Sequence, residues 1–167
     1  MTHDPFTEVI EMTFGYALAL GLHQLATIVW VGGMFFAHVA LRPALQDVIH
    51  GPERAVLMLA VFQRFFPWVW ASIILLWASG GFYFALALHG QAPLHVHLMM
   101  GIASLMTLIF IYIVVVPFRK WKAAIDHDNW PWAAAKIVLI RRLILVNLVL
   151  GMITAVAGSA GKFLLAA

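Results

Sequence analysis

The stretch Leu94-His95-Val96-His97-Leu98-Met99-Met100-Gly101 opens the apolar run 94–118, and it decides how the chain is interpreted. A run of this length is sufficient for a helix that crosses ~30 Å of hydrocarbon, which takes roughly 20 residues. The stretch therefore places histidines where a bilayer begins. Ionisable groups inside a membrane are costly and usually functional, so His97 is the first candidate for a functional residue.

The composition is that of an integral membrane protein. Of the 167 residues, 64% are hydrophobic and 10% are charged, and the mean hydropathy is +0.97. A soluble domain has about 25% charged residues. The absence of cysteine excludes disulfides, thiolate metal sites and thiol catalysis. The formal net charge is +3, but the basic residues lie at the ends of apolar segments, so we expect no nucleic-acid partner.

Four apolar segments are long enough to span a bilayer as helices. They cover about residues 13–41, 65–88, 94–118 and 143–165. Their continuous rather than alternating hydrophobicity argues against β spans. We therefore expect an all-α fold, a transmembrane four-helix bundle that forms one domain over residues 1–167. An amphipathic piece at 55–66 is expected at the membrane interface, with Pro67 starting or bending the second helix.

The basic residues predict the orientation of the bundle. Nine of the ten Lys and Arg residues lie in the connections 42–64 and 119–142, and only Lys162 lies on the other side. By the positive-inside rule, both termini face away from the cytoplasm. We expect a multi-pass protein of the bacterial inner (cytoplasmic) membrane that contacts the lipid bilayer.

Counting from the basic boundary places two histidines at one depth. His23 precedes Arg42 by 19 residues, and His97 precedes Arg119 by 22. At ~1.5 Å per residue these depths are roughly 29 and 33 Å, a difference smaller than one helical turn. Two imidazoles at one level, on different helices of a bundle, suit axial ligation of haem iron. We predict that they bind one haem b near the outer face.

Small side chains beside both histidines leave space for a flat macrocycle. The helical face of His97 carries Gly101 and Ser104, and the face of the first-helix histidine carries Ala26 and Thr27. No carboxylate or thiolate lies nearby in the sequence, which favours haem over a lone metal ion. A hydrogen-bonded packing role for each histidine is the alternative to ligation.

Other polar residues are weaker candidates. His38 lies 15 residues after His23, ~22 Å deeper on a similar face, where a second haem or a packing role is open. His95 points about 200° away from His97, toward a haem propionate or solvent. The candidates for propionate, quinone-headgroup or lipid-phosphate contacts at the inner side are Arg64, Arg141, Arg142 and Asn147. An interhelical hydrogen bond would be enough to satisfy the buried amide of Asn147.

A cluster of imidazole and thioether groups supports a rival metal hypothesis. His95, Met99 and Met100 offer ligands that suit Cu(I). Only residues three or four apart share a helical face, so His95 would converge with Met99, or His97 with Met100. Methionine also fills apolar gaps, which is the packing alternative.

Several short motifs, in a fixed order over residues 18–161, are similar to those of one membrane-protein family. In the first helix they are Leu22-His23-Gln24-Leu25-Ala26, Trp30-Val31-Gly32-Gly33-Met34-Phe35-Phe36 and Leu41-Arg42-Pro43-Ala44. Further along they are 62–70, 97–101, Ile140-Arg141-Arg142-Leu143 and Asn147-Leu148-Val149-Leu150-Gly151. Together they resemble small members of the copper-resistance D (CopD) superfamily. The name of that superfamily implies copper transport or resistance.

A sister group is the HemJ-type protoporphyrinogen oxidase, a four-helix haem-b membrane protein in which a first-helix His and a third-helix Lys serve the haem. His23 resembles that His, and His97 falls where that Lys would lie. A His pair departs from this pattern and favours six-coordinate haem that transfers electrons.

The leading hypothesis is therefore electron transfer between a periplasmic redox partner and membrane quinone. Copper transport and a HemJ-like oxidase activity are the alternatives. The small residues of the fourth helix also offer a surface for a homodimer.

Overall fold

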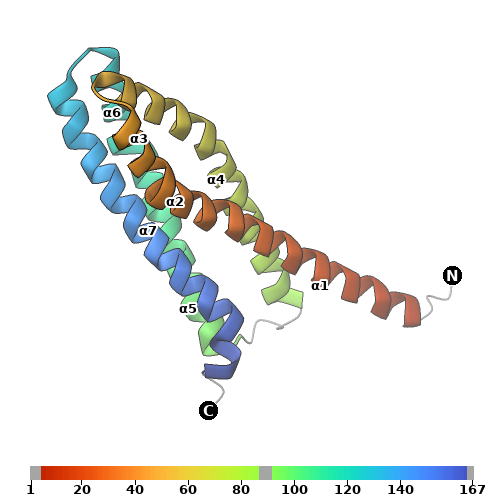
Figure 1. Cartoon of the computed structure of the whole chain (residues 1–167). Helices are drawn as coiled ribbons and strands as arrows, with labels where there is room; N and C mark the ends of the chain where they lie inside the picture. The colour runs from red at the N-terminus through yellow and green to blue at the C-terminus, as the bar shows by residue number, and fades with distance from the viewer. Residues whose placement is uncertain (1–4, 87–91, 165–167) are drawn as a thin grey trace.

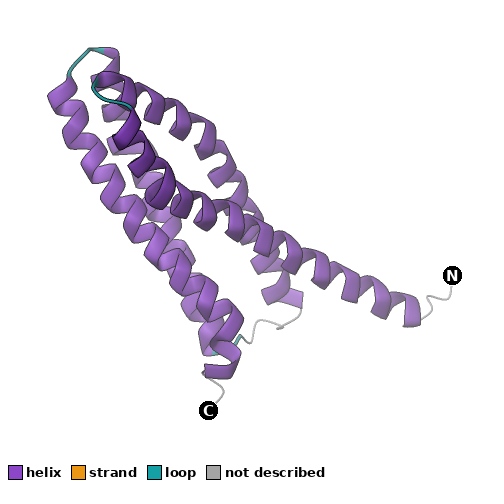
Figure 2. Cartoon of the chain, viewed as in Figure 1, coloured by secondary structure: helices purple, strands orange, loops and turns teal. Residues whose placement is uncertain are grey.

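The computed structural model describes residues 5–86 and 92–164. These residues form helices joined by short turns, and no strand occurs among them (Figures 1 and 2). In chain order, with η denoting a π-helical turn, the elements are α1 (Pro5–Thr27), η1 (Ile28–Gly32), α2 (Gly33–Phe36), η2 (Ala37–Leu41), α3 (Arg42–Val48), α4 (Pro52–Leu86), α5 (Leu94–Ile113), η3 (Val114–Phe118), α6 (Arg119–Asp126) and α7 (Trp130–Leu164).

The elements join into four long helices. The first runs from α1 through α3, the second is α4, the third runs from α5 through α6, and the fourth is α7. Within the described residues, each of the four is long and apolar enough to cross a membrane. The prediction of an all-α chain with four apolar spans is thereby confirmed.

The helices extend beyond the apolar segments that define the predicted spans. The second helix begins at Pro52, so the piece 55–66 is continuous with α4 rather than a separate interfacial helix, and Pro67 lies inside α4. The reason lies in the amphipathic pattern, since Met58 and Phe62 on one face of this piece are buried in the core. Similarly, the third helix continues past its apolar part to Asp126.

Two of the π-helical turns lie at prolines. η3 contains Pro117, and η2 directly precedes the turn of α3 that contains Pro43. Proline lacks an N–H group and its ring clashes with the preceding helical turn, and a widened turn relieves both problems. A different feature lies after η1, where the Phe65 ring of α4 occupies the space that a side chain at Gly33 would need.

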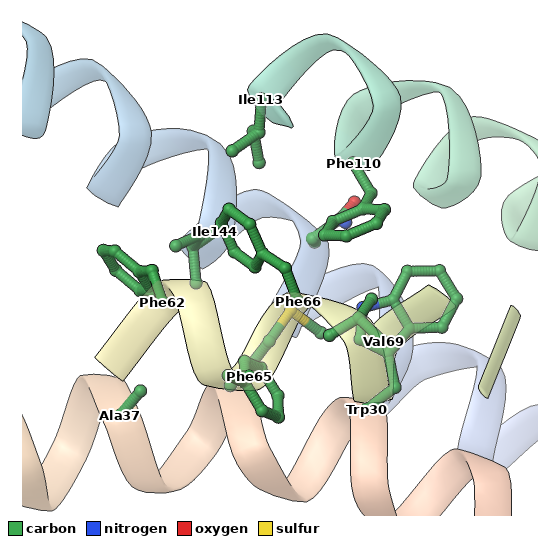
Figure 3. Close-up of a pocket in the computed structure, with 11 residues that line it drawn as sticks. Trp30, Ala37, Phe62, Phe65, Phe66, Val69, Phe110, Ile113 and Ile144 are labelled. Carbon is green, nitrogen blue, oxygen red and sulfur yellow. The ribbon is translucent and has the colours of Figure 1, made fainter. Parts of the chain in front are cut away.

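The hydrophobic core lies in the half of the bundle next to the α3–α4 and α6–α7 turns, which we call the turn half. Phe66 of α4 packs edge-to-face on Phe110 and Phe118, with ring centroids 5.4 and 4.8 Å apart. Trp30 of η1 meets Phe110 at 6.3 Å. Figure 3 shows the rings of Trp30, Phe66 and Phe110 between the helices. Such aromatic pairs stabilise the packing by ~0.5–1.5 kcal/mol beyond their buried area.

The other half of the bundle, which we call the terminal half, is open. The described ends of α1 and α7 lie at this end (Figure 1). Here α1 packs along α4, and α5 packs along α7. None of residues 94–105 on α5 and none of residues 152–160 on α7 is buried. The helix pairs α1–α4 and α5–α7 therefore meet at the core and diverge beyond it (Figure 1).

Candidate functional site

His23 lies on α1 and faces α4 in the terminal half. Its Nδ1 atom is 3.0 Å from Oγ of the buried Ser79, and its ring also lies against Gly80. The Ser79 hydroxyl donates its own hydrogen to the Leu75 carbonyl one turn earlier. With that hydrogen directed to Leu75, Oγ can accept from Nδ1–H, which is the tautomer in which Nε2 of His23 keeps its lone pair.

His97 lies in the first turn of α5. Its Nδ1 atom is 3.3 Å from the carbonyl oxygen of Pro93. A carbonyl oxygen only accepts, so Nδ1 is the protonated nitrogen and Nε2 again keeps its lone pair. The ring is exposed and packs edge-on against Phe84 of α4, with the two centroids 6.3 Å apart.

The two histidines thus share the hydrogen-bond pattern of metal-bound imidazoles. A ligating histidine almost always donates its other ring N–H to a carbonyl, carboxylate or water, which fixes the tautomer and the ring orientation. In His23 the acceptor is a serine hydroxyl, and in His97 it is a backbone carbonyl. The two Nε2 atoms are therefore the nitrogens suited to bind a metal.

Both histidines contact the part of α4 that lies in the terminal half. His23 contacts residues 79 and 80, and His97 contacts Phe84, which is five residues or ~7.5 Å away along the helix axis. That offset is more than one helical turn, whereas the count from the basic boundary gave less than one turn. Each ring packs on α4, however, and no ring contact joins the two in the described part of the chain.

The helical face beside His97 is open. Gly101 is exposed, and a Cβ atom added there would meet nothing within 4 Å. Ser104, one turn further, is half-buried and donates to the Met100 carbonyl at 2.8 Å. The Ser104 hydroxyl is therefore satisfied within its own helix, and this face presents mainly apolar surface with free space beside it.

The face beside His23 is more tightly packed. Ala26 is only 2% exposed. Thr27 is half-buried and donates to the His23 carbonyl at 2.9 Å, which is a bond within α1. At this level the surface of the chain is therefore more exposed beside His97 than beside His23.

The candidate copper ligands differ in their surroundings: one packs against α7, one is exposed and one is half-buried. Met99 packs against α7, because a Cβ atom at Gly158 would lie 2.9 Å from its Cε atom. Met100 is 38% exposed, and His95 is half-buried. Among the described residues, no group of three or more His, Cys, Asp or Glu side chains is placed to hold a metal ion. Haem needs only two axial ligands from the protein and does not depend on such a cluster.

His38 lies in η2 and is half-buried. It is 15 residues, ~22 Å along the helix, from His23. The structure therefore places it in the turn half, away from the other two histidines.

The arginines at the turn end differ from the predicted set. Arg64 and Arg142 are exposed. The half-buried Arg141 of α7 instead lies within electrostatic reach of Arg42 and Arg54. Sequence reasoning did not join these three, because the relative position of the α3–α4 turn and α7 is a property of the fold. The available signal in the sequence was that all three arginines belong to the basic connections that mark one boundary of the membrane.

Asn147 makes the interhelical hydrogen bond that its buried position predicted. Its Nδ2 atom donates to the Met106 carbonyl of α5 at 3.1 Å, whereas its buried Oδ1 atom has no partner. The side chain lines a cavity of about 20 Å³ whose other walls are apolar and include Trp30, Phe66 and Val69 (Figure 3). That volume is enough for about one water molecule.

No family model, curated protein or solved structure matches this chain. Fold and composition define its class as a small, multi-pass helical protein with four apolar helices long enough to span a membrane. The similarity to the CopD superfamily and the HemJ group stays a prediction from short sequence motifs.

Proposed function

We propose that this chain is a b-type haem-binding membrane protein in which His23 and His97 are the two axial ligands. One observation carries the proposal: each Nδ1 is hydrogen-bonded to an acceptor, Ser79 Oγ in one case and the Pro93 carbonyl in the other. This is the tautomer in which Nε2 binds a metal. Contact of both rings with residues 79–84 of α4 supports the pairing.

The open terminal half supports haem as the occupant. The macrocycle is large, flat and mostly apolar, and the site must offer it unfilled apolar space. Gly101 has open space beside it, and the neighbouring residues 94–105 are not buried by the rest of the chain. Two histidine ligands would leave no open position for a substrate, so the chemistry that a bound haem would supply is electron transfer.

The role of the chain itself is to bind and orient the cofactor. Ser79 and the Pro93 carbonyl hold the two imidazole rings by Nδ1, and the apolar helices exclude water from one side of the site. By the positive-inside rule the histidines lie near the periplasmic face of the bacterial inner membrane. The proposed reaction is electron exchange between a periplasmic redox partner and membrane quinone.

The test is the reduced-minus-oxidised spectrum of the purified protein. We expect a haem-b α-band that is lost in His23→Ala and in His97→Ala. His50→Ala and His127→Ala are the controls, since both remove an exposed histidine from a turn far from the terminal half, and they should keep the band. Full haem retention in both ligand variants would remove the assignment.

Metal analysis of the same preparation separates haem from the copper alternative. Haem iron at up to one equivalent per chain, without copper, agrees with the proposal. Stoichiometric copper without haem, lost on substitution of Met99 and Met100, would favour copper transport. Restoration of protoporphyrinogen oxidation in a strain that lacks it would favour the HemJ-like activity.

A further inference from the structure

Three arginine residues lie in the turn half of the bundle. Arg42 is the first residue of α3, Arg54 lies in the first turn of α4, and Arg141 lies on α7. All three are half-buried. The positive charges of Arg42 and Arg54 act on Arg141, so segments far apart in the sequence bring like charges together.

The described residues do not neutralise these charges. Among the side chains that the structure describes, in residues 12–86 and 92–160, no carboxylate forms an ion pair with any of the three guanidinium groups, and the charges that act on Arg141 are both positive. The Nε atoms of Arg42 and Arg141 are buried without a hydrogen-bond partner. Buried charges are normally paired, because desolvation without a partner is costly. An anion held at the outer N–H groups of these guanidiniums would neutralise the charges.

The donors fit a phosphate group. A guanidinium presents its N–H donors as a rigid planar fork that matches the oxygens of phosphate, often with two parallel hydrogen bonds. Three such forks around one point would surround a tetrahedral oxyanion. The three residues also belong to the basic connections that mark the membrane boundary, the depth at which lipid phosphates are found.

This site is separate from the histidines of the terminal half. Arg42 lies 19 residues beyond His23 along the first long helix, which corresponds to ~29 Å. A propionate of a haem bound at His23 could not span that distance. The inference therefore does not rest on the proposed haem function.

We propose that Arg42, Arg54 and Arg141 form a binding site for a phosphate-bearing anion at the turn end. The chemistry is shared by the phosphodiester of an anionic lipid and by free phosphate. The experiment below distinguishes these two sources.

The test measures thermal unfolding of the purified full-length protein in a neutral detergent. Phosphatidylglycerol, phosphatidylcholine and inorganic phosphate are each titrated, and the midpoint shift gives an apparent affinity. If the source is lipid, only phosphatidylglycerol raises the unfolding midpoint of the wild type. If the source is soluble, inorganic phosphate alone reproduces the shift. Either result supports the site, and no shift with any of the three overturns it.

Variants locate the effect at the cluster. Arg42→Gln and Arg141→Gln should each weaken the apparent affinity about 10-fold or more, since each removes charge-assisted hydrogen bonds. The matched controls Arg64→Gln and Arg142→Gln remove exposed arginines at the same end and should leave it within about 2-fold. Equal losses in controls and cluster variants would overturn the proposal in favour of non-specific charge attraction.

If a glutamine variant does not fold, a lysine variant still tests the anion site. Arg141→Lys retains the charge but loses the planar fork, so it should fold and still bind more weakly. Native mass spectrometry of the same protein should show one retained phosphatidylglycerol in the wild type and a lower occupancy in Arg141→Lys. Unchanged occupancy in Arg141→Lys would contradict a guanidinium-specific site.

Discussion

Nδ1 of His23 lies 3.0 Å from Oγ of Ser79, and this contact joins α1 to α4 in the open half of the bundle. The serine is buried, and its own hydrogen is directed to the Leu75 carbonyl of its helix. A hydroxyl fixed in this way acts as an acceptor. The contact therefore orients the imidazole and also selects its tautomer.

Removal of this acceptor should weaken cofactor binding without removing the ligand. In Ser79→Ala we expect haem occupancy after purification to fall, with a loss of about 10- to 100-fold in affinity, as is usual when the partner of a metal-bound histidine is removed. The measurement is the ratio of haem to protein from the pyridine haemochrome spectrum. Ser72→Ala, which alters another buried serine of α4, is the control. Equal haem loss in both variants would indicate general destabilisation rather than positioning.

The close approach of the first and second long helices depends on Gly33. An added methyl group there would collide with the Phe65 ring, whereas one at Gly32 meets nothing within 4 Å. We expect Gly33→Ala to destabilise the protein by ~1–3 kcal/mol through overpacking. Gly32→Ala should be neutral or slightly stabilising, because alanine favours the helix. Thermal unfolding in detergent measures both, and a milder effect at Gly33 than at Gly32 would contradict this packing.

The single hydrogen bond of Asn147 has a modest predicted value. Interhelical polar contacts in membrane proteins stabilise by ~0.6 kcal/mol on average, and the partnerless Oδ1 atom offsets part of that. Asn147→Leu should therefore be almost neutral, whereas Asn147→Ala should cost ~1–2 kcal/mol because it enlarges the adjacent cavity. The two unfolding midpoints test this, and equal losses would show that the amide itself matters more than its volume.

The aromatic core predicts where truncation is most damaging. Phe66 is 8% exposed and packs against Phe110 and Phe118. Phe66→Ala should destabilise by ~3–5 kcal/mol. Trp68→Ala, two residues away and 65% exposed, removes a larger side chain from the outer face and should have a much smaller effect. Unfolding of the purified variants provides the comparison, and a larger loss at Trp68 would contradict the assigned core.

The sequence predicted the features that depend on composition and helical rise. Hydrophobicity alone identified the four long helices. The fixed rise per residue predicted that His23 and His97 lie within one turn of each other in depth; in the structure their contacts on α4 are five residues apart. Burial also required the amide of Asn147 to find a partner, which it does on α5.

Features that depend on rotation and on contacts between helices could not be predicted in the same way. Ser79 was not singled out, because a serine on an apolar helix shows its role only when the neighbouring helix is placed. Arg42 and Arg54 were assigned to topology, since their approach to Arg141 requires the folded α3–α4 turn. The second and third long helices extend beyond their apolar segments, to Pro52 and to Asp126. They do so because an amphipathic segment can continue an apolar helix when its apolar face packs against the neighbouring helices.

The π-helical turn Ile28–Gly32 has a consequence for the geometry of the first helix. Its backbone bonds span five residues instead of four, so it holds one residue more than a regular turn. Every position beyond it, His38 included, is thereby rotated by about 100° from where a regular helix would place it. The turn acts as a single-residue insertion. Side chains before it and side chains after it therefore face different directions around the axis of the same long helix.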